Sequence, residues 1–418
     1  MALKTSAGGS MKKEKLFVVS PIGMLVTISI IIMIFQYNIS QVFPAVNYYD
    51  EIFAIIVFLI YIVRNPKINV SQLKVIALAS VTVFVGLIGN LLFSFQKLPV
   101  AIVADILSVI KVPLVLLSIM YSMTQNEIKY TVSHLCSAFR IYIYIAAIIA
   151  IYAYITGNST FFASERFGIG AYKFVSQNAG VFGYVLMGML SAMTLNKNPK
   201  KGDSIIKILA LIMIALTTKG PQLVFVALYI FFYLFRLGKL RWYHIATVGV
   251  IAVLLSGYQI QHYIKPTEAR YALTVGSLKI ARDYFPVGTG FATFGSEMSK
   301  AYNYSQVYVL YGLNLIRGLN REYTAYVTDN YWPMIIGQFG LVVAVLFLFY
   351  YFNLFKKINK NTKRTIEQRQ IFLAMFITFM FGSLGSAYLT AVEGVIDFVY
   401  IGMFLNIKNG DEIGNAKI

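Results

Sequence analysis

Residues 268–340 read EARYALTVGSLKIARDYFPVGTGFATFGSEMSKAYNYSQVYVLYGLNLIRGLNREYTAYVTDNYWPMIIGQFG, and this stretch decides the fold because it interrupts a chain of apolar runs. Most of it is polar and aromatic. Its charged residues include Arg270, Arg282, Arg317 and Arg321, with Asp283, Glu322 and Asp329. If the protein does chemistry, we expect it in this segment and in the helix that begins at its end.

The rest of the chain is too apolar for a soluble protein. Of its 418 residues, 58% are hydrophobic and 13% are charged, whereas soluble domains average about 25% charged residues. This composition predicts an all-α polytopic membrane protein. The net charge of +19 does not indicate nucleic-acid binding, because most of the cations lie in short loops between apolar runs. We expect no disulfide, because Cys136 is the only cysteine.

Runs of about 15–25 apolar residues can each cross about 30 Å of hydrocarbon. We count about twelve, at 16–36, 49–63, 73–94, 100–122, 138–156, 177–195, 205–218, 220–236, 242–258, 330–355, 370–389 and 391–407. The expected organisation is a tag remnant over 1–10, transmembrane helices 1–9 over 11–258, a large, partly helical extracytoplasmic loop over 259–329, transmembrane helices 10–12 over 330–408, and a cytoplasmic tail over 409–418. Within the loop we expect a helix from Glu268 to Arg282.

The distribution of lysine and arginine sets the orientation. With both termini in the cytoplasm, most cations fall on the inner side, and the short outer loops carry only Lys97, Arg166, Lys173 and Lys219. The long loop then lies outside, where its length exempts it from the positive-inside rule. Arg166 and Lys219 are therefore expected on the same side of the membrane as this loop.

Several short motifs follow one another between residues 160 and 345. They are Glu165-Arg166-Phe-Gly-Ile-Gly, Gln177-Asn178-Ala-Gly180, Thr218-Lys219-Gly220, Arg270 with Gly276, Phe285-Pro286-Val-Gly288-Thr-Gly290-Phe291, and Asp329-Asn330-Tyr331 with Gly340 eleven positions after Asp329. Their order and spacing resemble those of the O-antigen ligase and Wzy-type polysaccharide polymerase superfamily. Lys219 stands where that family has arginine, and Asp329-Asn330 where its ligases have His-Asn, which favours a polymerase.

The resemblance implies a helical fold like that of the C-type glycosyltransferases and a metal-independent enzyme without a cofactor. It implies a bacterial cytoplasmic membrane protein that makes capsular, exopolysaccharide or O-antigen-type polymers on the outer face. The donor and acceptor would be oligosaccharides on polyprenyl diphosphate. The implied protein partners are a flippase and a chain-length regulator. Two alternatives stay open: a glycan ligase of the same superfamily, and a lipid-linked oligosaccharide flippase or secondary transporter.

Such a transfer needs cations around the leaving diphosphate and a base near the acceptor hydroxyl. Guanidinium groups suit phosphate because they donate in a bidentate fork. We therefore expect Arg166, Lys219, Arg270 and Arg282 to bind the diphosphate, and Asp329 and Arg270 to be catalytic. We expect no metal ligand, because the three histidines are far apart and there is one cysteine.

Each candidate also has a structural reading. Arg270 and Arg282 are twelve positions apart, so on one helix they point about 120° away from each other. Arg282 would then pair with the adjacent Asp283. Asp329 would serve as the N-cap of the helix that follows, with Pro333 in the first turn.

Charged residues also occur within the predicted spans. Asp105 and Lys111 lie six positions apart, on different faces of one helix, so we expect each to pair elsewhere. Glu393 and Asp397 share a face of the last helix, and one of them could meet Lys111.

Overall fold

The computed structural model describes residues 20–196, 198–235 and 263–406, together with Tyr243, Ala246, Thr247 and Val250. The chain is mostly helical over this part. The span predicted over 242–258 falls almost entirely outside the described residues. The tag remnant predicted over 1–10 and the tail predicted over 409–418 lie outside them as well.

Long apolar helices confirm the coarse prediction of a helical membrane protein. Five helices in the described part are long and apolar enough to cross a membrane: Pro44–Arg64 (η1 and α3), Val70–Phe93 (α4), Pro99–Ser122 (α5), Gln125–Thr156 (α6) and Tyr331–Asn359 (α15). The shorter helices are α1 (Pro21–Ile34), α2 (Gln36–Ser40), α7 (Ala179–Leu195), α8 (Asp203–Leu216), α9 (Gly220–Phe235), α16 (Ile366–Gly382) and α17 (Val392–Leu405). Every predicted span other than 242–258 coincides with a helix.

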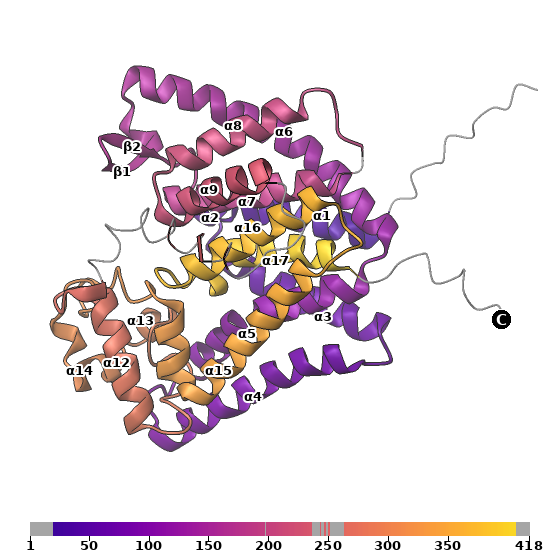
Figure 1. Ribbon diagram of the computed structural model, residues 1–418. Coiled ribbons are helices and arrows are strands. Elements are labelled where there is room, and N and C mark those ends of the chain that lie inside the picture. Colours follow the sequence, from indigo (N-terminus) through magenta and orange to yellow (C-terminus); the bar gives the residue numbers. More distant parts are fainter. Residues whose placement is uncertain are drawn as a thin grey trace, which may run out of the picture.

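The helices are layered around α17. Nearly every residue of α7 and α17 is buried, and α17 packs on α1, α5 and α7 near the middle of the bundle (Figure 1). The outer helices expose large aliphatic side chains instead. Val63, Leu91 and Ile155 are each about 80% exposed. Apolar side chains on the outside and a packed interior are the pattern expected when lipid, not water, surrounds the bundle.

Two helix boundaries differ most from the hydropathy-based prediction. The start of α6 lies thirteen positions before the predicted 138, because Thr124 and Glu127 form a capping box that begins a polar first half. Helix α16 ends at Gly382, seven positions before the predicted 389, because the chain turns at Ser383–Ser386. Hydropathy detects the lipid-facing part of a helix and misses its polar extensions and turns.

A small domain-like cap lies at one end of the bundle, beside α15 (Figure 1). It comprises α12 (Ala269–Asp283), α13 (Met298–Ala301), α14 (Gln306–Leu310) and η3 (Leu313–Leu315). The helix expected from Glu268 to Arg282 is confirmed as α12. The cap has its own apolar core, which includes Leu273, Phe294 and Tyr308. The long polar segment is therefore folded, and it holds the start of α12 against the start of α15.

The glycine-rich segment 286–295 enters the bundle between α4, α5 and α15. Its backbone approaches so closely that a Cβ on Gly290 would lie 2.4 Å from the backbone nitrogen of Asn90, and one on Gly340 would lie 2.3 Å from the carbonyl oxygen of Pro286. Gly340 also has φ 76°, which breaks the helical backbone of α15 at this contact. A non-helical backbone is tolerated inside the bundle because protein surrounds it on all these sides.

Polar side chains of the spans satisfy the backbone of this buried segment. Asn90 bonds both the N–H and the carbonyl of Phe291, at 2.8 and 2.9 Å, and Gln338 donates to the carbonyl of Phe294 at 2.7 Å. Asp105 accepts the N–H of Ala292 at 2.6 Å. The expectation that Asp105 pairs elsewhere than with Lys111 is confirmed, and its partner is a backbone amide.

Candidate functional site

The predicted catalytic residues meet where α12 and α15 both begin. Arg270 lies in the first turn of α12, and Asp329 lies two residues before α15. Nε of Arg270 is 3.4 Å from Oδ2 of Asp329, with 18% and 27% of these side chains exposed. The ion pair is partly desolvated yet open to a ligand. A guanidinium partner favours the ionised carboxylate, which is the form a general base needs.

Two further groups orient the Arg270 guanidinium. Nη2 donates to the carbonyl oxygen of Gly385 at 3.1 Å, in the turn after α16. The guanidinium carbon lies 5.9 Å from the ring centre of Tyr263, within the range of a cation–π interaction. Neither contact follows from the sequence analysis, because a backbone carbonyl carries no sequence signal and Tyr263 lies outside the predicted motifs.

Asn330 connects the same elements and settles the capping question. Its side-chain amide donates to the carbonyl of Arg270 at 3.2 Å and accepts from the hydroxyl of Tyr263 at 3.4 Å. Asn330 is also the N-cap of α15, and its side chain makes no capping bond. The reading of Asp329 as the N-cap is therefore wrong. The first turn of α15 is held by tertiary contacts, such as the bond from the Tyr331 N–H to the carbonyl of Ser383.

Lys219 comes from a third region of the chain. It follows Thr218, whose φ is 54°, and its carbonyl accepts from the N–H of Leu223, so Lys219 caps α9. The pKa of Lys219 is lowered to about 8, by burial first and then by the positive charges of Arg166 and Arg270, while Asp329 opposes these effects. The N-terminus of α9 adds positive partial charge here. Lys219 therefore belongs to the same electrostatic cluster as the Arg270–Asp329 pair.

Arg166 is the fourth member of this cluster. It ends β1 (Phe162–Arg166), which forms an antiparallel hairpin with β2 (Ile169–Tyr172). The hairpin is tied to α6 by the bond from the Tyr154 hydroxyl to the carbonyl of Gly170, at 2.7 Å. Arg166, Lys219, Arg270 and Asp329, here called the cation cluster, thus come from segments far apart in sequence.

Arg282 is not brought to the cation cluster. It lies twelve positions along α12 from Arg270, a rise of about 18 Å. Its side chain is 77% exposed and pairs with Asp283 at 2.9 Å. The Tyr311 hydroxyl and Arg282 hold the pKa of Asp283 below its usual value. The structure thus supports the ion-pair reading of Arg282 and gives it no position near Asp329.

A second charged cluster lies inside the bundle. Lys111 of α5 bonds Asp50 and Glu51 of α3. Glu393 is near enough to Lys111 for electrostatic interaction, but neither Glu393 nor Asp397 forms an ion pair with it in the described part of the chain. Both carboxyl oxygens of Asp397 are buried without a hydrogen-bond partner among the described residues. The proposed contact of Glu393 or Asp397 with Lys111 is corrected: α3 supplies the direct partners.

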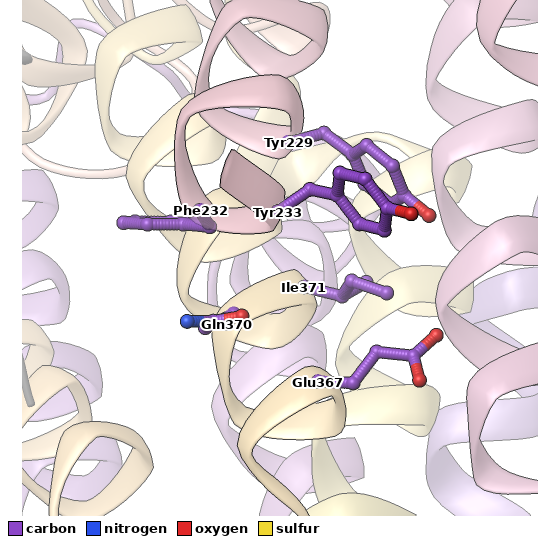
Figure 2. A pocket seen from close by; sticks show the side chains of 6 residues that line it. All are labelled: Tyr229, Phe232, Tyr233, Glu367, Gln370 and Ile371. Atoms are coloured by element: carbon purple, nitrogen blue, oxygen red, sulfur yellow. The ribbon is translucent and has the colours of Figure 1, made fainter. Parts of the chain in front are cut away.

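A small crevice between α9 and α16 is separate from the cation cluster. It holds about 20 Å³, enough for about one water molecule. Figure 2 shows the side chains that line it: Tyr229, Phe232, Tyr233, Glu367, Gln370 and Ile371. These residues lie toward the end of α9 and the start of α16, whereas Lys219 precedes α9 and Gly385 follows α16. The crevice is therefore at the far ends of both helices.

The cation cluster can hold an anionic group and place a carboxylate beside it. Arginine and lysine attract phosphate oxygens, and Asp329 can accept a proton from a hydroxyl. Within residues 20–196, 198–235 and 263–406, no group of three or more His, Cys, Asp or Glu side chains could hold a metal ion. In comparisons with known proteins, no family model and no curated protein matches this sequence, so the chemistry of the cation cluster has to carry the functional conclusion.

Proposed function

We propose that this protein is a membrane glycosyltransferase that extends a polysaccharide, moving a glycan from polyprenyl diphosphate to the next lipid-linked repeat unit. One observation carries the proposal: Arg166, Lys219 and Arg270 converge with Asp329 although they come from separate segments. Three cations outnumber the one carboxylate of the cation cluster, so the cluster favours an anionic ligand. A diphosphate supplies that anion, and the resemblance to the O-antigen ligase and Wzy-type superfamily supports the same substrate.

The proposed reaction breaks one carbon–oxygen bond and forms another. The glycosidic bond to the diphosphate breaks, and its electron pair leaves on the diphosphate oxygen. Arg270 and Lys219 stabilise the negative charge that grows there. The acceptor hydroxyl forms the new bond to the sugar carbon and gives its proton to Asp329. Gly385 and Tyr263 act as positioning groups, because they hold the Arg270 guanidinium toward Asp329.

The proposed topology has about twelve spans, with both termini in the cytoplasm and the cation cluster outside. The match between helices and predicted spans supports this arrangement, and so does the positive-inside pattern of the loops. The protein would then lie in a bacterial cytoplasmic membrane, with its substrates presented on the outer face.

Purified protein and a synthetic repeat unit on polyprenyl diphosphate test the proposal directly. Wild-type protein should produce a ladder of lengthening glycans. Arg270→Ala and Asp329→Ala should each slow the transfer by about 100-fold or more. Arg282→Ala is the matched control, because it removes an arginine of the same helix that lies outside the cation cluster. A ladder that survives both cluster substitutions would overturn the site, and no ladder from wild type would overturn the polymerase.

The buried charges around Lys111 favour a second candidate, a carrier. Ionisable groups inside the membrane often mark the path of a transported ion or substrate. A carrier would move the lipid-linked oligosaccharide across proteoliposome membranes and would leave its glycan unchanged. A ligase would instead give one product on an acceptor that is not a repeat unit. The same preparations distinguish the three activities by their products.

A further inference from the structure

An open cleft of about 540 Å³ lies in the cap, and the residues that line it do not include those of the cation cluster. Residues of two segments line it: Asn303, Tyr304 and Gln306 at the start of α14, and Asn314 and Asn320 after α14. Most lining side chains are polar, while Val309 of α14 and the ring of Tyr304 contribute apolar surface. A cleft of this size in a membrane protein's cap can hold a ligand much larger than a water molecule.

The amide side chains are available to a ligand. Those of Asn303, Gln306 and Asn314 make no hydrogen bond within the described part of the chain. Each amide carries both an acceptor oxygen and a donor NH₂ group. The remaining charges of the cleft, Arg321 and Glu322, are opposite in sign. The cleft therefore offers paired donors and acceptors with no net charge.

Tyr304 gives the cleft a rigid aromatic wall. Its hydroxyl donates to the carbonyl of Leu319 at 2.5 Å, which anchors the end of the side chain. The ring stacks on Tyr308, with centres 5.3 Å apart, and Tyr308 stacks in turn on Phe294. A fixed ring loses little freedom when a ligand packs against it, which favours binding.

We propose that this cleft binds the neutral glycan part of a repeat unit. Sugar hydroxyls both donate and accept, as the amides do, and the C–H face of a sugar ring packs on an aromatic ring. A phosphate or an acidic peptide would find no excess of positive charge here. A wholly apolar peptide would leave the amide groups of the lining without hydrogen-bond partners.

The cleft is within reach of the cation cluster. Glu322 lines the cleft and stands seven residues before Asp329, so their Cα atoms are at most about 25 Å apart. A glycan held at the cation cluster by its diphosphate could extend into the cleft. This inference rests on the proposed function only for the identity of the glycan, because the cleft itself is independent of any transfer step.

A binding experiment without catalysis tests the inference. The probe is the free repeat-unit oligosaccharide, released from the lipid-linked pool of the source cell by mild acid, so that it carries neither lipid nor phosphate. Its binding to the purified full-length protein is followed by saturation-transfer NMR. Wild type should bind it, and Asn303→Ala combined with Gln306→Ala should lower the affinity about tenfold or more.

Two further variants make the result specific. Gln41→Ala, which removes an exposed amide in the turn after α2, should bind like wild type. Arg270→Ala should also retain binding, because the probe has no phosphate. Equal unfolding temperatures would show that the variants are folded. The inference is overturned if wild type does not bind, if the double substitution leaves affinity unchanged, or if Arg270→Ala alone abolishes binding. The glycan ladder decides the proposed function separately.

Discussion

Sequence reasoning could single out the charged members of the cation cluster because each breaks a local pattern. Lys219 is a cation in a very short loop, and Asp329 stands where a polar segment meets an apolar run. The contacts that orient Arg270 had no such signal. The Gly385 carbonyl is chemically the same as any other backbone carbonyl, so only the fold reveals its role.

Lys219 makes the proposed activity sensitive to alkaline pH. Its pKa in the free protein is lowered to about 8, by burial first and then by Arg166 and Arg270. The ammonium form binds phosphate, so kcat/KM should fall as the pH rises through about 8. Lys219→Arg should move this decline to higher pH, because arginine stays protonated. Rates measured between pH 6.5 and 9.5 check this, and an unchanged profile in Lys219→Arg would exclude Lys219 as the titrating group.

The lowered pKa of Lys219 affects the stability of the fold in the opposite direction to its effect on activity. The unfolded chain keeps Lys219 protonated up to its usual pKa of about 10.4, whereas the folded protein releases that proton near pH 8. Between these values the unfolded state binds more protons, so the contribution of Lys219 to the free energy of unfolding rises with pH. Above pH 8 the free energy of unfolding should therefore rise while kcat/KM falls. Such opposite trends are expected for charges that are placed to bind a ligand and do not stabilise the fold.

At the scale of elements, hydropathy predicted where helices lie and failed where the chain is polar but buried. The segment 286–295 contains turn residues and was expected in an outer loop, yet it packs between α4, α5 and α15. The compensating groups, Asn90, Asp105 and Gln338, look anomalous in the spans until the segment is placed beside them. The buried segment needs these polar side chains as hydrogen-bond partners, and they need its backbone groups. Nothing in the local sequence pattern shows that the two lie together.

Gly290→Ala tests how tightly this segment is packed. Gly290 has φ 90°, and an added Cβ would meet Asn90 at 2.4 Å, so both backbone strain and a clash oppose the substitution. We expect a loss of about 2–4 kcal/mol in the free energy of unfolding. Gly312→Ala is the control, because Gly312 also has a positive φ of 67° but no atom within 4 Å of the added Cβ. Thermal unfolding in detergent should rank wild type above Gly312→Ala and Gly312→Ala above Gly290→Ala. Equal losses would mean that strain alone decides the effect.

On the scale of the whole molecule, α15 decides which parts share a side of the membrane. Its 29 residues span at most about 43 Å, longer than the hydrocarbon core of about 30 Å. The cap adjoins the Tyr331 end, and the turn that leads into α16 adjoins the Asn359 end. If α15 crosses the bilayer, the cap and this turn must lie on opposite sides.

Single introduced cysteines test this arrangement. Cys136 is buried, so the native thiol should give little background with a membrane-impermeant maleimide. Tyr302→Cys, in the cap, should be labelled in intact cells, because Tyr302 is 41% exposed. Lys363→Cys, in the turn before α16, should be labelled only after permeabilisation, because the positive-inside pattern predicts that this turn is cytoplasmic. The reverse pattern would put the cation cluster on the cytoplasmic side. Polymerisation on the outer face would then be impossible, whereas a carrier with alternating access would remain compatible with the buried charges around Lys111.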